Sequence, residues 1–128
     1  MADKPLRILL TDDDPLLQEL MEILLDQDNY SLVKVGNGEE AVAACEAEVF
    51  DLIILDLIMP KMTGLEFLAW LRYEQGATTP VLVLTSLTDY EVIDSVLQSG
   101  ADEVICKPLN IKSFVDKVNK LARQGMGA

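Results

Sequence analysis

The segment Asp51-Leu52-Ile53-Ile54-Leu55-Asp56 places four consecutive aliphatic residues between two aspartates. A strand that is apolar at every position has both faces covered, as in the middle of a parallel sheet. Two other segments of strand length contain similar apolar runs, Ile8-Leu9-Leu10 and Val81-Leu82-Val83-Leu84. The sequence therefore predicts three inner strands of one parallel sheet.

Working outward from these runs, the apolar pattern predicts five strands in all. They are Leu6–Thr11, Ser31–Gly36, Asp51–Asp56, Pro80–Thr85 and Glu103–Cys106. The second contains Lys34 and the fifth is short, so both are expected at the edges of the sheet. Helical patterns fill the gaps between the strands and follow the last one, which gives five alternating pairs of strand and helix.

The helix starts carry capping residues. Asp14 before Pro15 is a typical beginning, because the aspartate caps free N–H groups and proline fits the first turn. The second helix is expected over about Glu39 to Glu48, and the fifth after Asn110. The third and fourth are each predicted to begin with a capping box, Thr63 to Glu66 and Thr88 to Glu91, and the fourth to end at Gly100.

This alternation predicts an α/β fold, (βα)5, with a doubly wound five-stranded parallel sheet and helices on both faces. The expected strand order is 2-1-3-4-5, with ligands bound beyond the carboxyl ends of the first and third strands. That rule indicates Thr11–Asp14 and Asp56–Met59. The length fits one domain over residues 1–128, with its core over about 6–123.

Composition excludes several classes of function. The chain has 22 acidic and 10 basic residues, a net charge of −12, which disfavours unaided binding to nucleic acid or an anionic membrane. Histidine is absent, which excludes His-dependent nucleophilic catalysis, His zinc sites and phosphohistidine. Cys45 and Cys106 form no C-x-x-C pair and are expected to be small buried hydrophobes in a reducing cytosol. No apolar run approaches a membrane span, so the expected location is cytoplasmic.

Polar residues stand at the carboxyl ends of four of the five predicted strands. They are Asp12-Asp13-Asp14, Asp56, Thr85-Ser86 and Lys107-Pro108. Each alone could be a solvated loop residue, and Asp14 is expected only to cap its helix. Parallel strands bring their carboxyl ends to one edge of the sheet, so acids, hydroxyl and lysine are expected to meet there.

Such a group of side chains suits phosphoryl transfer. Two carboxylates about 4 Å apart repel by about 4 kcal/mol at an effective dielectric constant near 20, and a divalent cation removes that penalty. A few hard oxygen ligands that leave room for water and phosphate suit Mg²⁺. A carboxylate can itself act as the nucleophile and form an aspartyl phosphate, with Lys107 and Thr85 contacting phosphoryl oxygens.

The whole chain resembles a response-regulator receiver domain, the phosphoacceptor of two-component signalling, of the stand-alone type similar to chemotaxis regulators. The resemblance implies a flavodoxin-like fold. It rests on these segments in order: Ile8-Leu9-Leu10-Thr11-Asp12-Asp13-Asp14, Asp51 to Pro60, Met62-Thr63-Gly64, Val83-Leu84-Thr85-Ser86, Gly100-Ala101 and Lys107-Pro108.

The resemblance also implies a role for each site residue. Asp56 is similar to the phosphorylated aspartate. Asp13 and Asp56, with the backbone carbonyl of Ile58, are similar to direct Mg²⁺ ligands, whereas Asp12 acts mainly through ordered water. Thr85 resembles the hydroxyl that moves to the phosphoryl group. Lys107 resembles the lysine that contacts this group, and its bond to the following proline is expected to be cis.

Three positions depart from the common pattern of that family. Val104 stands where many members have Tyr or Phe, which turns inward on activation. Ile58 and Leu87 stand two residues after the phosphorylated aspartate and the switch threonine, where polar residues are frequent. These departures leave the chemistry in place and affect the expected signal output and phosphate lifetime.

The resemblance implies partners as well. The phosphoryl group comes from a sensor histidine kinase or a histidine phosphotransfer protein, and the domain signals by phosphorylation-dependent binding of a downstream protein. It acts as a monomer or a phosphorylation-dependent dimer, and catalyses its own phosphorylation and slow dephosphorylation without conventional substrate turnover. The alternative is a receiver fragment of a longer regulator whose output domain is missing.

Other functions on similar folds stay open at this point. A haloacid-dehalogenase phosphatase also uses an aspartyl nucleophile, but it needs an acid where this chain has Ile58. A flavodoxin-type electron carrier needs a phosphate loop after the first strand, where Asp12-Asp13-Asp14 would repel a flavin phosphate. A catalytically silent interaction module would not need the set Asp13, Asp56, Thr85 and Lys107.

Overall fold

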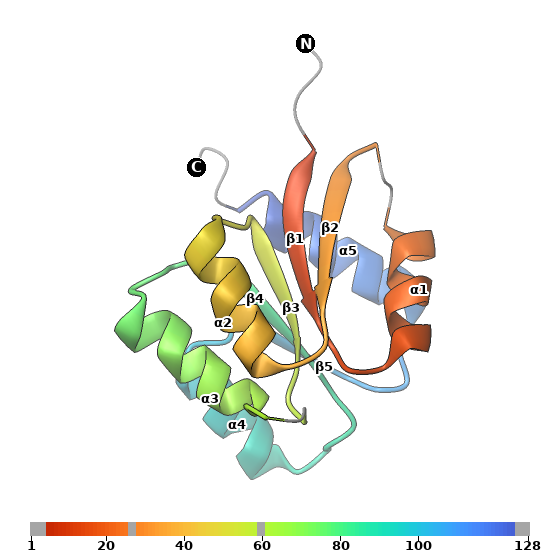
Figure 1. The fold of residues 1–128 in the computed structure, drawn as a ribbon. Helices are drawn as coiled ribbons and strands as arrows, with labels where there is room; N and C mark the ends of the chain where they lie inside the picture. Colours follow the sequence, from red (N-terminus) through yellow and green to blue (C-terminus); the bar gives the residue numbers. More distant parts are fainter. Residues whose placement is uncertain (1–4, 26–27, 59–60, 125–128) are drawn as a thin grey trace.

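The computed structural model describes residues 5–25, 28–58 and 61–124. Strands and helices alternate along the chain (Figure 1). The strands are β1 (Leu6–Thr11), β2 (Tyr30–Val35), β3 (Leu52–Asp56), β4 (Val81–Thr85) and β5 (Glu103–Cys106). The helices are α1 (Pro15–Leu24), α2 (Gly38–Ala47), α3 (Gly64–Ala69) with η1 (Trp70–Glu74), α4 (Tyr90–Gln98) and α5 (Ile111–Ala122).

All neighbouring strands pair in parallel, in the order β2-β1-β3-β4-β5. This confirms the predicted doubly wound α/β sheet. Every residue of β3 and β4 is buried, whereas β2 and β5 are largely half-buried, in keeping with their edge positions. The inner strands are apolar throughout because helices cover both of their faces.

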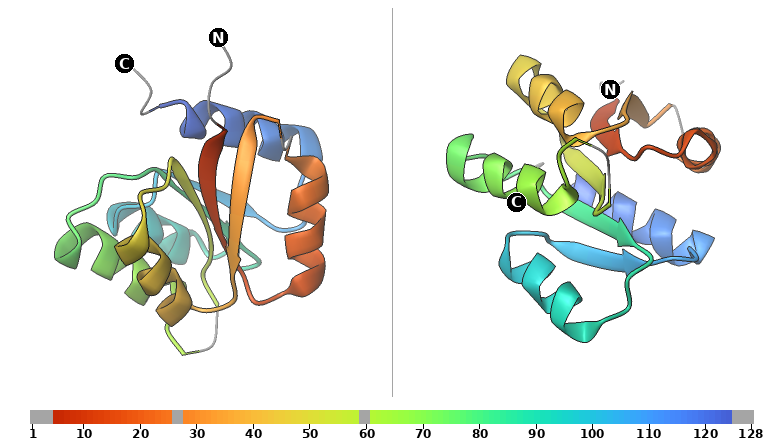
Figure 2. Two further views of the ribbon diagram at one scale, coloured as in Figure 1. Left: turned by 45° about the horizontal axis from the view of Figure 1, so that its top comes forward. Right: turned by 60° about the horizontal axis from the view of Figure 1, so that its bottom comes forward.

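Helices lie on both faces of the sheet (Figure 2). The sheet separates two apolar cores. One lies under α2, α3 and α4 and includes Phe67 and Val96. The other lies under α1 and α5 and includes Met21 and Phe114. Successive strand residues point to opposite faces, so each inner strand contributes to both cores. In the described part of the chain, no helix has the length and apolar character that crossing a membrane requires.

Most helix starts agree with the sequence. Asp14 caps α1, Asn110 caps α5, and Thr63 forms the predicted capping box with Glu66. The predicted start of α4 at Thr88 is wrong. Asp89 is the N-cap instead, and its carboxylate accepts a hydrogen bond from the Glu91 N–H. Both residue types cap helices well, and the sequence offers them at consecutive positions.

Two further features concern helix ends. Gly100 follows α4 with a φ of 118°, which glycine adopts without strain, so the predicted end of this helix is confirmed. The helix that begins with α3 continues into the π-helical turn η1, which the sequence pattern did not indicate. Met59 and Pro60 of the family-like segment lie outside the described residues.

Candidate functional site

Three aspartates meet at the carboxyl ends of β1 and β3. Each of Asp12, Asp13 and Asp56 offers one carboxylate oxygen, and these oxygens lie within 4.8 Å of one another. The two strands are neighbours, with Thr11 opposite Leu55, so the residues that follow reach the same edge. Asp12 is 1% exposed and Asp56 9%, whereas Asp13 is exposed. The predicted cluster of acids therefore exists.

Backbone N–H groups hold the two buried carboxylates. The Asp14 N–H donates to Asp12 Oδ1 at 2.9 Å, and the Ile58 N–H donates to Asp56 Oδ1 at 3.3 Å. Among the described residues, Asp12 Oδ2 has no hydrogen-bond partner although it is buried. A buried carboxylate oxygen without a partner is costly, and a cation would remove that cost.

Lys107 faces two of these acids from the end of β5. Its Nζ lies 3.8 Å from Asp12 Oδ2 and 3.8 Å from Asp56 Oδ2. The Lys107–Pro108 peptide bond is cis, as the family resemblance implies. The lysine therefore supplies one positive charge to a cluster that contains three acids.

The pKa values of the buried acids reflect this environment. Burial raises the pKa of Asp12 above its usual value of 3.8, against the opposing effect of the Asp14 N–H. Burial also raises the pKa of Asp56, while the Ile58 N–H and Lys107 oppose the change. Neighbouring negative charge adds to the rise in both cases. The cluster thus disfavours its own fully ionised form, and this tendency favours binding of a cation.

Thr85 ends β4, the strand between β3 and β5. It is 1% exposed, and its Oγ1 accepts a hydrogen bond from the Leu87 N–H at 3.0 Å. Asp56 pairs with Leu84 in the sheet, so Thr85 is one residue beyond the level of Asp56. The hydroxyl therefore belongs to the same edge as the acids and Lys107.

The donor set fits a hard divalent cation. Three carboxylates lie together, one has a buried oxygen that accepts no hydrogen bond from the described residues, and one is open to solvent. Oxygen ligands in small number, with room for water, are typical of Mg²⁺ sites. The acids and Lys107 together carry the charges that could hold a cation beside a phosphoryl group.

The positions that depart from the family pattern fall into two environments. Val104 is half-buried and packs against the core under α2, α3 and α4. Ile58 is 61% exposed and Leu87 36% exposed, both just beyond the strand ends that carry Asp56 and Thr85. The edge of the site therefore presents two apolar side chains to solvent.

The structure corrects the prediction for the cysteines. Cys45 and Cys106 are free and half-buried, not fully buried. Burial raises the pKa of the Cys45 thiol to about 11, so this thiol stays protonated at neutral pH. Neither residue belongs to the acid cluster.

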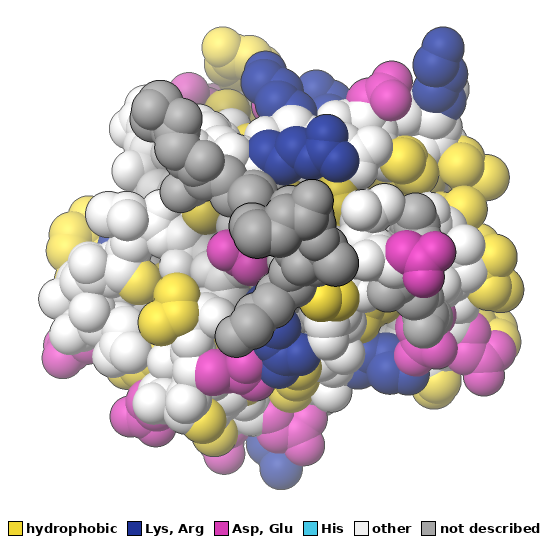
Figure 3. Space-filling model, turned by 90° about the horizontal axis from the view of Figure 1, so that it is seen from above, with side chains coloured by type: hydrophobic (Ala, Val, Ile, Leu, Met, Phe, Trp, Pro, Cys, Tyr) yellow, Lys and Arg dark blue, Asp and Glu magenta, His cyan; other side chains and the backbone are white. Residues whose placement is uncertain are grey.

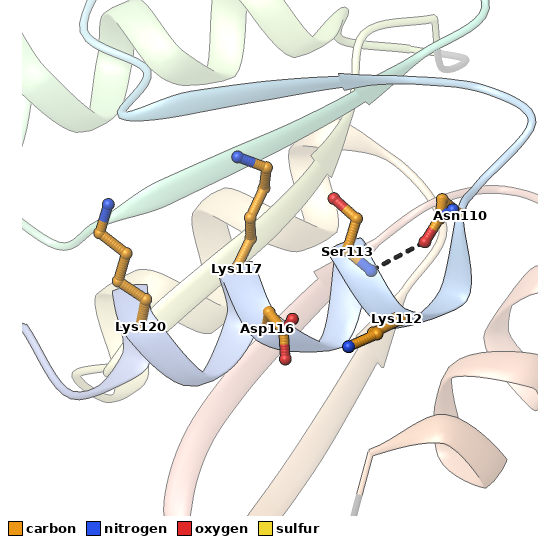
Figure 4. A pocket seen from close by; sticks show the side chains of 6 residues that line it. All are labelled: Asn110, Lys112, Ser113, Asp116, Lys117 and Lys120. Atoms are coloured by element: carbon orange, nitrogen blue, oxygen red, sulfur yellow. Dashed lines mark hydrogen bonds between the residues drawn. The ribbon is translucent and has the colours of Figure 1, made fainter.

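A groove on α5 lies apart from the predicted site. Figure 4 shows its lining residues, Asn110, Lys112, Ser113, Asp116, Lys117 and Lys120. Lys117 pairs with Glu103 of β5 at 3.2 Å. Figure 3 views the end of the molecule at which the strands begin, and Lys and Arg side chains are prominent along its upper margin. None of the predicted site residues lines this groove.

Sequence reasoning missed Gln18 and Gly38, which support the site from α1 and α2. The Gln18 amide donates to the backbone carbonyls of Asp12 and Val35. Gly38 packs directly against Met62, in the connection that follows Asp56. No local pattern indicates either contact, because both join segments that are separate in the sequence.

Comparison with known proteins agrees with this geometry. The DNA-binding response regulator MtrA of Mycolicibacterium smegmatis is 36% identical over 118 residues, which are 92% of this chain and 51% of MtrA. The transcriptional regulatory protein TrcR of Mycobacterium tuberculosis is 34% identical, over 94% of this chain and 46% of TrcR. The chain thus spans about half the length of these regulators.

Solved structures share the fold over nearly the whole chain. The receiver domain of the Francisella response regulator 1452 matches with a TM-score of 0.86 and 28% identity, over 93% of this chain and 98% of that domain. The chemotaxis response regulator CheY4 of Vibrio cholerae matches with a TM-score of 0.84 and 28% identity, over 92% and 99% of the two chains.

The family model of the response regulator receiver domain matches residues 8–119. That range contains the two acids that follow β1, the acid that ends β3, the hydroxyl that ends β4 and the lysine that follows β5. The chain therefore belongs to the response-regulator receiver-domain family of two-component signalling.

Proposed function

We propose that this domain accepts a phosphoryl group on Asp56 from a phosphohistidine and signals through the phosphorylated form. The observation that carries the proposal is the arrangement of Asp56 among Asp12, Asp13 and Lys107 at one edge of the sheet. A carboxylate oxygen of Asp56 attacks phosphorus, an O–P bond forms, and the N–P bond of the donor breaks. The proton required by the leaving imidazole comes from solvent.

The remaining residues would neutralise and position charge. Asp13, Asp56 and the backbone carbonyl of Ile58 would hold Mg²⁺, with Asp12 acting through ordered water. When bound, Mg²⁺ neutralises charge on the carboxylates and the phosphoryl oxygens. Lys107, already 3.8 Å from Asp56, would pair with a phosphoryl oxygen. Thr85 would exchange its hydrogen bond from the Leu87 N–H for contact with the phosphoryl group.

The partners follow from the same chemistry. The donor is a sensor histidine kinase or a histidine phosphotransfer protein in the cytoplasm, since the chain itself has no histidine. The phosphorylated domain, a single unit over residues 1–128, would bind a downstream protein as a monomer or a dimer. It would lose the phosphoryl group slowly by its own hydrolysis.

A second candidate is favoured by the length of the relatives. MtrA and TrcR are about twice as long as the matched region, and MtrA is described as DNA-binding. In that case this domain is the receiver part of a regulator whose output region binds DNA. The net charge of −12 disfavours nucleic-acid binding by the receiver itself.

The test is intact-mass measurement after incubation with acetyl phosphate and Mg²⁺. Wild type should gain one phosphoryl group and Asp56→Asn none, because an amide is not a nucleophile of this kind. Asp14→Asn is the matched control, since Asp14 lies at the same edge but caps α1. If Asp56→Asn gains the same mass as wild type, the assignment of the phosphoacceptor is wrong.

A further inference from the structure

Gln18 of α1 contacts the backbone of the acid cluster. Its side-chain Nε2 donates to the Asp12 carbonyl at 2.8 Å and to the Val35 carbonyl at 3.3 Å. The Asp12 N–H also donates to the Val35 carbonyl, at 3.1 Å. One amide thus joins the residue after β1 to the end of β2.

The position of Gln18 is itself fixed by the start of α1. Its backbone N–H donates to the Asp14 carbonyl at 3.1 Å, and Asp14 caps the helix through its side chain. Two hydrogen bonds therefore restrain the connection from Asp12 to Gln18. The Gln18 N–H bonds the Asp14 carbonyl, and the Gln18 side-chain amide bonds the Asp12 carbonyl. The turn that carries Asp12 and Asp13 lies between these two restraints.

Such a restraint opposes the repulsion within the site. Asp12, Asp13 and Asp56 place carboxylate oxygens within 4.8 Å of one another, and the described lysine contacts reach only Asp12 and Asp56. Asp13 is exposed, so packing does little to keep its carboxylate near the other two. A turn that is free to move would let these charges separate and would weaken a shared cation site.

We propose that Gln18 is a positioning residue for the cation site, acting through the Asp12 carbonyl to keep Asp12 and Asp13 close to Asp56. This inference rests on the proposed function, in which these acids serve Mg²⁺-dependent phosphorylation. Groups that hold metal ligands in place change metal affinity by about 10- to 100-fold when removed. Gln18 holds a ligand-bearing turn rather than a ligand atom, so we expect the lower end of that range.

The test compares Gln18→Met with wild type by calorimetric titration of Mg²⁺. Methionine has similar length and flexibility but cannot donate to the two carbonyls. The dissociation constant for Mg²⁺ should rise about tenfold. Gln98→Met is the matched control, because Gln98 also lies in a helix and its amide donates to Asp94 within the same helix. Its dissociation constant should equal that of wild type.

Phosphorylation kinetics separate positioning from a general loss of stability. In Gln18→Met, the initial rate with acetyl phosphate should fall at limiting Mg²⁺ and return to the wild-type rate at saturating Mg²⁺. Gln18→Asn keeps an amide but is too short to reach both carbonyls, and it should show the same pattern. If Gln18→Met does not fold, Gln18→Asn serves in its place for the Mg²⁺ titration and the phosphorylation kinetics.

The possible failures are distinguishable. If wild type binds Mg²⁺ and the Gln18 variants bind it equally well, the positioning role is wrong while the proposed function stands. A lower urea midpoint with an unchanged dissociation constant also contradicts the positioning role, since the amide then only stabilises the fold. If wild type neither binds Mg²⁺ nor becomes phosphorylated, the proposed function and this inference both fail.

Discussion

Lys107 Nζ lies 3.8 Å from Asp56 Oδ2, although β5 and β3 are not neighbours in the sheet. The lysine reaches past the end of β4, where Thr85 lies, and meets Asp12 at the same distance. A single ammonium group therefore faces two buried carboxylates, with the exposed Asp13 beside them. The cluster keeps an excess of negative charge until a cation binds.

The first prediction concerns that excess charge. Asp13→Asn should raise the melting temperature without Mg²⁺, because it removes one of three mutually repelling carboxylates. The same change should erase the stabilisation that Mg²⁺ gives wild type by binding the folded state. Thermal unfolding with and without Mg²⁺ measures both effects. Asp14→Asn is the control: asparagine caps a helix about as well as aspartate, so this variant should keep both the α1 cap and the Mg²⁺ response. A wild-type response in Asp13→Asn would place the ion elsewhere.

The second prediction concerns pH. The pKa of Asp56 is raised in the folded state by burial, so the folded protein holds this proton more tightly than the unfolded chain. Between the usual value of 3.8 and the raised value, stability without Mg²⁺ therefore falls as pH rises. Asp56→Asn has no such titration. As the pH rises through this range, its free energy of unfolding should therefore increase relative to that of wild type.

Urea denaturation at a series of pH values between about 4 and 7 measures this difference. Mg²⁺ should reduce it, because the cation offsets the charge of the ionised aspartate. If the difference in free energy of unfolding between wild type and Asp56→Asn is independent of pH, the raised pKa of Asp56 is contradicted.

The third prediction concerns the lifetime of the aspartyl phosphate. Hydrolysis needs a water in line with the bond that breaks, oriented by a hydrogen-bonding neighbour. Ile58 and Leu87, which are exposed beside Asp56 and Thr85, cannot orient a water and should crowd it out. Misplacing a reacting group costs about two orders of magnitude in rate, so the phosphorylated form should be long-lived.

Decay of the acyl phosphate should be followed in wild type, Ile58→Asn, Leu87→Glu and the double variant. Faster decay in the variants is expected, with the double variant fastest. Equal rates in all four proteins would show that these side chains have no kinetic effect.

The fourth prediction concerns the packing of α2 against the connection after β3. A Cβ at Gly38 would lie 2.4 Å from Met62 Cβ and 2.6 Å from the Met62 carbonyl oxygen. Gly38→Ala should therefore destabilise the protein by about 1–3 kcal/mol, as overpacking does. At Gly36 the nearest atom would be 3.7 Å away, so Gly36→Ala should change stability by about 0.5 kcal/mol or less. Equal urea midpoints for the two variants would contradict this interpretation of the contact.

The sequence was sufficient for the sheet and for the acids at its edge. Apolar runs such as the one before Asp56 indicate a strand that is buried on both faces. Parallel strands all end at the same edge of a sheet, so the residues at their carboxyl ends lie close together. It was insufficient where two signals compete or where separate segments meet. Thr88 and Asp89 are both good caps, and only the structure shows that Asp89 is used. The local sequence shows Gln18 only as a helical residue, because its contact with Val35 depends on the fold that places α1 beside β2.

The division of the interior into two cores has a thermodynamic consequence. Phe67 and Phe114 are both completely buried, but they lie on opposite faces of the sheet and belong to different clusters. Residues that share no partners contribute additively to stability. Repacking beneath α2, α3 and α4 should therefore leave the energetics of the α1 and α5 side almost unchanged.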